Sequence, residues 1–376
     1  MPYRPGAELR PLSAPRVFRT RADRRGFEPL DPGPLPAPDR APTPWRMGPH
    51  TLPIWTGKPV SRLTVDMTAG GLGDAIRTLA VVRGALREGR VERVQIVANP
   101  GAALTFLAGA VSPISVVPPR QAIPGDAVLP PCYMMPMLAW TAWPVKPLTG
   151  IVAALVGLPI ASLAGPCLNV AVAEVDAVLR ALQAIGWAEE PVIAVQTNGH
   201  AVGAALTRAL HHEKVPHGLH DLVPELTRRG FFVMRVGGPS GADRSPRVLD
   251  LGGSTLARMA AALWVADLAV AGDSGPLHMA AAIGTPVVTL FGPSDPAMHV
   301  CAIGTQPVVP PASFCPHLPC GAGSPLGGPT LPDHSTRVPL PCPPQGGCLS
   351  RLSGADLGRA LDVVFQAMRP GPRAQG

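Results

Sequence analysis

Apolar runs typical of buried strands alternate with helical segments along most of this chain. The alternation begins at Arg62, and a helix at residues 175–185 leads into a second series of the same kind. The expected strands, in chain order, are residues 63–67, 94–98, 114–117, 191–195, 231–236, 268–271 and 286–290. Because such alternation forms parallel sheets with helices on their faces, the pattern predicts an α/β protein. Two successive doubly wound, Rossmann-like units that meet near residues 172–190 are the economical arrangement, with a ligand site in the cleft between them.

Two helices stand out at the ends of this pattern. Residues 254–266 predict a helix with Ser254 as its natural N-cap. Residues 353–368 predict an amphipathic helix that closes the fold, since its apolar side chains recur on one face. The apolar run at residues 148–165 is broken by glycine and proline, so a short buried helix and loop is expected there rather than a membrane span.

The first sixty residues differ from the rest of the chain. They contain 14 prolines, and ten basic residues stand against five acidic ones. This composition predicts a disordered, extended basic arm over residues 1–60, which is either a solvated tail or a segment attracted to anionic lipid headgroups. Of the net charge of +7, only about +2 remains for the other 316 residues, and aromatic residues make up only 4% of the chain. A nucleic-acid partner is therefore not expected.

The chain shows no export signal, because its first thirty residues hold seven arginines without an apolar stretch between them. A cytoplasmic protein is the default expectation. The seven cysteines, an odd number, are then not expected to form a disulfide framework.

A glycine-rich turn joins the first expected strand to its helix. In the segment Gly70-Gly-Leu-Gly-Asp74, the glycines Gly71 and Gly73 let backbone N–H groups approach an acceptor or a phosphate. The spacing fits neither a dinucleotide fingerprint nor a P-loop. Asp74 either caps the helix or acts as a general base at the mouth of the cleft.

A second strand–turn–helix segment covers residues 271–284. Its strand is expected to end at Asp273, Pro276 starts a helix where its missing N–H costs nothing, and Gly284 ends that helix. Free N–H groups at the helix start predict an anion pocket, with Asp273 near a sugar hydroxyl. The candidate ligand-binding residues here are Asp273, Ser274, Gly275, Pro276 and His278.

Together these segments resemble glycosyltransferase family 9, whose best-known members are the ADP-heptose:lipopolysaccharide heptosyltransferases. The resemblance covers about residues 62–366 and is strongest over residues 266–296. Residues 73–79, 195–199 and 237–239 are also similar to family segments. Lys214-Val-Pro216 resembles the family's Lys-x-Trp-Pro without the tryptophan.

The resemblance implies a GT-B fold, with an N-terminal acceptor-binding domain at residues 61–175 and a C-terminal nucleotide-sugar-binding domain at residues 188–350. It implies an inverting transfer that requires no cofactor or catalytic metal, with Asp74 as the base. The donor, with ADP-heptose favoured, is expected to be a nucleotide-diphospho-sugar. The acceptor would be a saccharide or lipid-linked saccharide in envelope polysaccharide synthesis, at the inner membrane face. The expected donor-binding residues are Thr197, Asn198, Lys214, Asp273, Ser274, Gly275, Pro276 and His278.

Four cysteines fall in the Pro- and Gly-rich loop at residues 303–347 or directly beside it. Cys315, Cys320, Cys342 and Cys348 hold a structural iron or zinc ion, are ordinary free thiols or form disulfides. Family members that heptosylate autotransporter proteins carry an iron-binding finger in this stretch, so a protein heptosyltransferase is an alternative reading. A nucleotide-sugar epimerase and a non-catalytic nucleotide-sugar-binding scaffold are further alternatives.

Overall fold

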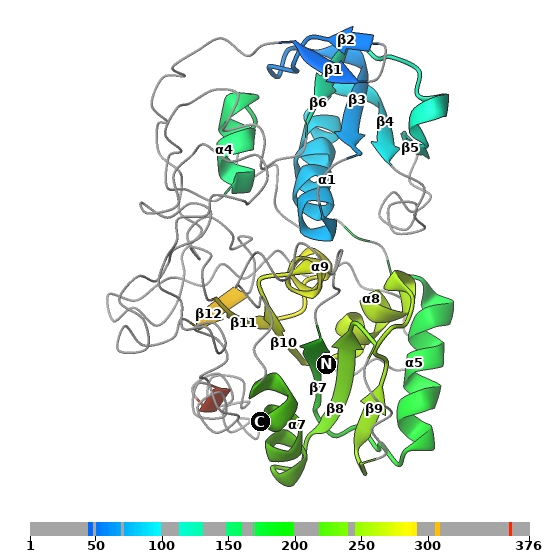
Figure 1. The fold of residues 1–376 in the computed structure, drawn as a ribbon, viewed down its shortest axis with the longest axis vertical. Coiled ribbons are helices and arrows are strands. Elements are labelled where there is room, and N and C mark those ends of the chain that lie inside the picture. The colour runs from blue at the N-terminus through cyan, green and yellow to red at the C-terminus, as the bar shows by residue number, and fades with distance from the viewer. Residues whose placement is uncertain are drawn as a thin grey trace, which may run out of the picture.

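The computed structural model describes two α/β domains, one above the other in Figure 1. The described residues are 44–47, 50–68, 71–98, 113–130, 148–159, 168, 170–198, 218–239, 245–291, 305–308 and 361–362. The upper domain holds the strands β1 to β6 with α1 and α4, and the lower domain holds the elements from α5 onward.

The N-terminal domain is built on a parallel sheet in the order β5-β4-β3-β6. The last five residues of β3 are all buried, as expected for a strand inside a sheet that is covered on both faces. All three strands expected in this part of the chain are confirmed, as is a short helix within residues 148–165, whereas β6 was not predicted. The elements are β3 (Val60–Met67), α1 (Leu72–Arg87), β4 (Val91–Ala98), β5 (Ile114–Val117), the 3₁₀ turn η1 (Pro119–Gln121), β6 (Ala127–Leu129) and α4 (Leu148–Leu155).

The C-terminal domain is built on a second parallel sheet in the order β12-β11-β10-β7-β8-β9. Read from β9 to β12, with β7 counted as the first strand of the domain, this order is 3-2-1-4-5-6, the strand order of a Rossmann sheet. The expected α/β class with two Rossmann-like units is therefore confirmed. The elements are α5 (Val172–Ala184), β7 (Val192–Asn198), α7 (Gly218–Arg228), β8 (Phe232–Gly237), β9 (Val248–Asp250), α8 (Leu256–Val265), β10 (Leu268–Gly272), α9 (Gly275–Ile283), β11 (Val287–Leu290) and β12 (Thr305–Val308).

The strand order reverses at one place in each sheet, between β3 and β6 and between β7 and β10. In open parallel sheets, ligands bind outside the carboxyl ends of the strands at this reversal. The helix α1 follows β3 and the helix α9 follows β10, so both start at a reversal point. The two helices contact each other where the domains meet (Figure 1).

The ordered core begins earlier than the sequence predicts. Two short antiparallel strands, β1 (Trp45–Met47) and β2 (His50–Leu52), lie within the expected disordered arm of residues 1–60. The Trp55 side chain is only 1% exposed, and its indole N–H donates to the Lys58 carbonyl. The Trp45 indole donates to the buried Asp66 carboxylate at the end of β3. The expected boundary at residue 60 is therefore wrong, because two tryptophans among many prolines form no periodic apolar pattern that would predict their burial. Residues 1–43 of the expected arm lie outside the described residues.

The N-cap of α8 also differs from the sequence expectation. The capping hydroxyl belongs to Thr255, which accepts a hydrogen bond from the Arg258 backbone N–H, and not to Ser254. Ser254 instead donates its own backbone N–H to the Leu251 carbonyl, in the turn before the helix. Two adjacent hydroxyl residues are both good caps, and sequence alone does not choose between them.

The short described segment Leu361–Asp362, helical in the structure, docks on the C-terminal domain. Leu361 is 1% exposed and lies in the hydrophobic cluster beneath α7, while Asp362 forms an ion pair with Arg229. The rest of the expected closing helix at residues 353–368 lies outside the described residues.

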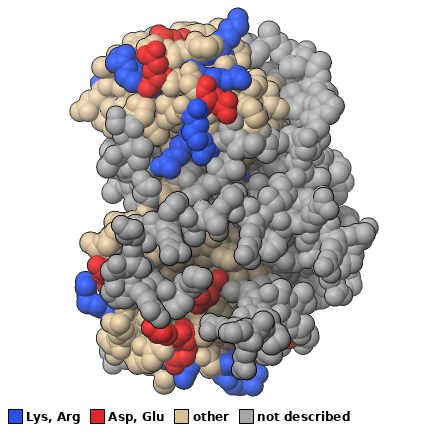
Figure 2. Space-filling model, turned by 180° about the vertical axis from the view of Figure 1, so that it is seen from behind, with Lys and Arg blue, Asp and Glu red and all other residues tan. Residues whose placement is uncertain are grey.

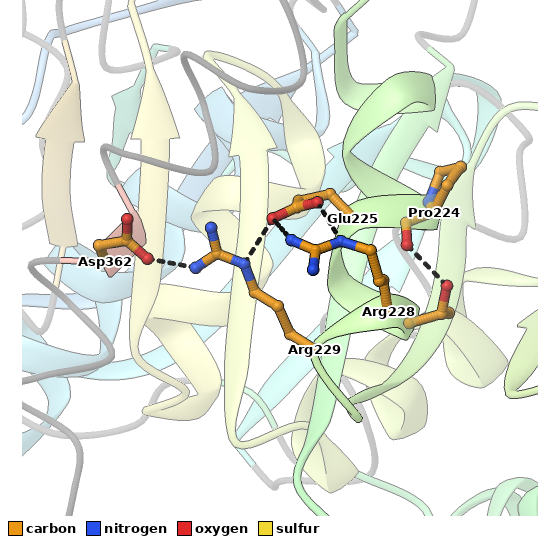
Figure 3. Close-up of polar contacts among 6 residues, drawn as sticks. Pro224, Glu225, Arg228, Arg229 and Asp362 are labelled. Atoms are coloured by element: carbon orange, nitrogen blue, oxygen red, sulfur yellow. Dashed lines mark hydrogen bonds and ion pairs between the residues drawn. The ribbon is translucent and has the colours of Figure 1, made fainter.

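An exposed charge cluster on α7 meets this segment (Figure 3). The Arg229 guanidinium lies between the carboxylates of Glu225 and Asp362, and Arg228 also donates to Glu225. Hydrogen bonds from Arg228 and then Arg229 lower the pKa of Glu225 to about 2.

On the face seen in Figure 2, positive and negative side chains of the described residues lie interspersed on both domains. Within the described ranges, no helix is long and apolar enough to cross a membrane.

Removing residues 1–58 should destabilise the protein or prevent its folding, because it deletes the buried side chains of Met47, Leu52, Ile54 and Trp55. Loss of one such large side chain alone costs about 3–5 kcal/mol. The measurement is urea unfolding followed by circular dichroism. The matched control is removal of residues 1–43, which should leave the unfolding midpoint near that of the full chain. Equal stability of both truncations would contradict the docking of β1, β2 and Trp55.

The low pKa of Glu225 gives a second prediction. Its carboxylate should stabilise the fold above the pKa of an unfolded glutamate, about 4.3, and lose that contribution as the pH falls toward about 2. Glu225→Gln should therefore unfold at lower urea than wild type at pH 6, with the gap narrowing at pH 3. Since the group is exposed, salt should also narrow the gap. Glu189→Gln, which removes an exposed carboxylate elsewhere, is the control, and a gap that stayed constant with pH would contradict the account.

Candidate functional site

The first half of the site is the start of α1. Gly71 is the N-cap, and the backbone N–H of Gly71 donates to Asp74 Oδ2 at 3.0 Å. Asp74 is thus the third residue of the helix, and its carboxylate reaches back as in a capping box. Its side chain remains 22% exposed, so this partner does not shut it off from solvent or from a substrate hydroxyl.

The second half is the turn that joins β10 to α9. Ser274 is the N-cap of α9, Pro276 lies in the first turn, and Gly284 ends the helix in the left-handed conformation with φ 94°. The Ser274 hydroxyl does not cap the helix, because it donates instead to Gln196 Oε1 at 2.6 Å. The same oxygen accepts the Gly272 backbone N–H at 3.2 Å, so Gln196 ties the ends of β7 and β10 together. The N–H groups of the first turn of α9 therefore receive no side-chain cap from Ser274, and such groups attract anions.

Two glycines allow these halves to approach each other closely. A Cβ atom on Gly73 would lie 2.3 Å from Cδ2 of His278, and a Cβ atom on Gly275 would lie 2.8 Å from Cδ2 of Leu72. Each helix start therefore has a glycine where a side chain of the other helix packs. The sequence predicts these glycines as ligand-binding positions, and the structure gives them a second role in domain contact.

A buried polar chain crosses the contact between the domains. Arg77 Nη2 lies 2.9 Å from Nε2 of His278, and both side chains are about 5% exposed or less. Because a guanidinium can only donate, His278 Nε2 is the acceptor, and the imidazole is neutral with its proton on Nδ1. Arg77 Nη1 lies 3.7 Å from Asp74 Oδ1, and His278 Nε2 lies 3.8 Å from Asp273 Oδ1. Arg77 thus joins Asp74 to His278 across the domains, whereas the neutral ring forms no ion pair with the nearby Asp273.

The remaining candidate residues are divided between described and undescribed parts of the chain. Thr197 is 3% exposed at the carboxyl end of β7, and its Oγ1 has no hydrogen-bond partner in the part of the chain that the structure describes. Asn198 is the last residue of β7, in register with Gly237 of β8. Lys214 and the cysteines Cys315, Cys320, Cys342 and Cys348 lie outside the described residues. Among the residues that are described, no cluster of His, Cys, Asp or Glu could hold a metal ion.

Sequence reasoning missed two residues of this site, Arg77 and Gln196. Arg77 lies three positions after Asp74, so both side chains share one face of α1, and a charged residue within an apolar helix stretch is the available signal. Gln196 is flanked by buried strand residues, and its amide is only 2% exposed. Their partners are 201 and 78 residues away in the sequence, a separation that local patterns do not bridge.

The segment that carries α9 decides the relationship of this chain to known proteins. Residues 244–308, from before β9 to the end of β12, match the model of glycosyltransferase family 9 (heptosyltransferase). The family 9 resemblance is confirmed. With it the expected enzyme class is confirmed, a glycosyltransferase. The matched segment contains the complete turn from Asp273 to His278.

Solved structures support the same fold over most of the chain. A family 9 glycosyl transferase from Veillonella parvula is similar with a TM-score of 0.55 at 14% identity, over 82% of this chain and 98% of that one. The iron-containing dodecameric glycosyltransferase TibC from enterotoxigenic E. coli is similar with a TM-score of 0.55 at 15% identity, over 85% of this chain and 79% of that one. TibC has also been solved in complex with ADP-D-beta-D-heptose. The expected GT-B fold is thereby confirmed. A search of curated protein sequences gave no match to this chain.

Substitution of Gly73 by alanine tests the close approach of α1 and α9. Helix propensity alone favours alanine over glycine by about 1 kcal/mol. The clash with His278 should outweigh that gain, so Gly73→Ala should lower the free energy of unfolding by about 1–3 kcal/mol in urea titrations. Gly71→Ala is the matched control, because a Cβ there meets its first atom only at 3.8 Å. A Gly73→Ala protein more stable than wild type would contradict the contact.

Proposed function

We propose that this protein is an inverting, metal-independent glycosyltransferase that moves heptose from ADP-heptose to a saccharide or lipid-linked saccharide. One observation carries the proposal. A partly exposed carboxylate, that of Asp74, and an anion-attracting helix start, that of α9, lie on opposite domains and are joined through Arg77 and His278. Transfer of a sugar needs both parts, a base for the acceptor and a site for the departing diphosphate.

Asp74 is the general base in this proposal. An acceptor hydroxyl must lose its proton as the oxocarbenium-like centre forms, and a carboxylate can take it. The side chain is accessible at 22% exposure, and its position is fixed by the Gly71 N–H and by Arg77. A base that is held in place and still reachable meets the geometric requirement for the role.

The start of α9 is the donor site. The diphosphate gains negative charge as it leaves, so the N–H groups of Gly275 and Leu277 stabilise it more strongly in the transition state than in the bound donor. Fixed dipoles of this kind take the place of a divalent ion, which is why no catalytic metal is invoked. The buried Oγ1 of Thr197 offers a hydrogen-bonding group to the donor from the neighbouring strand end. Asn198, Asp273 and Lys214 complete the proposed donor set.

The acceptor class separates this proposal from its main alternative. TibC, whose fold this chain shares, is an iron-containing heptosyltransferase, and the chain carries four cysteines between residues 315 and 348. Those observations favour a protein heptosyltransferase with a structural iron or zinc ion as the second candidate. The excess of basic residues in the N-terminal segment supports a transfer reaction at the inner membrane face, where these residues would be attracted to anionic lipid headgroups.

The test is ADP release from ADP-heptose in the presence of saccharide or peptide acceptors. Asp74→Asn should lower kcat by about 10²-fold or more while the donor KM changes little, because the amide cannot take the proton. A chelator added to the wild-type reaction should leave kcat unchanged. Asp176→Asn, on α5 away from the site, is the control and should behave as wild type.

Each result has a distinct meaning. Asp74→Asn with wild-type kcat would remove Asp74 from the base role. Wild-type protein that binds ADP-heptose but releases no ADP in the presence of any acceptor would favour the non-catalytic binding scaffold. Faster release with peptides than with saccharides would favour the protein-glycosylating alternative.

A further inference from the structure

We propose that Arg77 is a positioning residue for the transfer reaction, which aligns the base only when the domains are in contact and His278 is neutral. The inference rests on the proposed function of Asp74. Arg77 belongs to the acceptor domain, yet its guanidinium donates to a side chain of the donor domain at 2.9 Å.

The surroundings of Arg77 define what it can do. Its side chain is 5% exposed, and a buried cation is stable only where hydrogen bonds and opposite charges compensate for lost hydration. Two carboxylates flank the chain, with Asp74 Oδ1 3.7 Å from Nη1 and Asp273 Oδ1 3.8 Å from His278 Nε2. Separation of the domains would break the bond to His278, while the ion pair with Asp74, which lies on the same helix, would remain. Contact of the domains therefore fixes the guanidinium, and the guanidinium fixes the near oxygen of the base.

The protonation state of His278 controls this link. The neutral ring accepts the hydrogen bond from Arg77, whereas a protonated ring has no free lone pair and carries a second positive charge against the guanidinium. Charged groups near the ring include Arg77 from α1, with Asp74 beside that guanidinium, and Asp273, which directly follows β10. Protonation of the ring in acid should therefore weaken the link, and the base should lose its alignment.

A purely structural role for Arg77 makes a different prediction. If Arg77 only filled space and balanced charge, its loss would lower stability, and the pH profile of the remaining activity would keep its shape. A positioning role predicts a change in kcat with little change in donor KM, and a change in the acid limb of the profile. Kinetics as a function of pH therefore separates the two roles.

The experiment compares four full-length proteins with ADP-heptose and the acceptor that wild type uses, from pH 5.5 to 8.5. They are wild type, Arg77→Gln, Arg77→Lys and Arg87→Gln. Arg87 is exposed in the last turn of the same helix, so its variant controls for loss of one positive charge on α1. Urea unfolding verifies that each variant is folded.

Arg77→Gln should lower kcat at pH 7.5 by about tenfold or more with a donor KM within about threefold of wild type. The fall in kcat between pH 7.5 and 5.5 should be smaller than in wild type, because protonated His278 no longer faces a cation. Arg77→Lys should recover part of kcat, since the ammonium keeps the charge but cannot reach both partners as the planar guanidinium does. Arg87→Gln should match wild type throughout.

Three outcomes would overturn the inference. The first is wild-type kcat and an unchanged pH profile in folded Arg77→Gln. The second concerns the case in which Arg77→Gln does not fold. Arg77→Lys is then the test variant, and a kcat equal to that of wild type at every pH would exclude the positioning role. The third is wild-type protein without transfer activity, which defeats the proposed function and this inference together, whereas the first two leave the proposed function intact.

Discussion

The close packing of two helix starts, one from each domain, is the interaction on which the rest of the site depends. It requires Gly73 beneath His278 and Gly275 beneath Leu72, because a Cβ at either position would enter the side chain of the opposite helix. Only at this separation can Arg77 reach His278 across the domains. Steric close approach thus comes first, and the hydrogen-bonded link between the domains follows from it.

The topology explains why this contact coincides with the candidate site. Both helices leave their sheets where the strand order reverses, and the carboxyl ends of β7 and β10 are held together there by Gln196. Each domain therefore presents its ligand-binding edge to the other. In the proposed function, Asp74 on one edge is the base and the start of α9 on the other edge receives the departing diphosphate. The chemistry that we propose needs no group beyond what these two edges supply.

The sequence predicts the elements that have periodic apolar patterns, but it does not predict the contacts between side chains that are far apart in the chain. Most strands of the two sheets follow from apolar runs, although the short strands β6, β9 and β12 were not predicted. Asp74 and the turn at Ser274 follow from strand–glycine–helix patterns. The link from Arg77 to His278 could not be predicted, because it depends on how two separately folded sheets meet. The docking of Trp55 was missed for a related reason, since one buried side chain in a proline-rich segment leaves no periodicity to read.

The most direct measurement of the central claim is a crystal structure of the protein with ADP-heptose bound. The account predicts diphosphate oxygens within hydrogen-bonding distance of the Gly275 and Leu277 N–H groups, with the sugar directed across the domain contact toward the Asp74 carboxylate. The link from Arg77 to His278 should be retained in that complex. A diphosphate bound away from the start of α9, or a sugar that Asp74 cannot approach, would contradict the account.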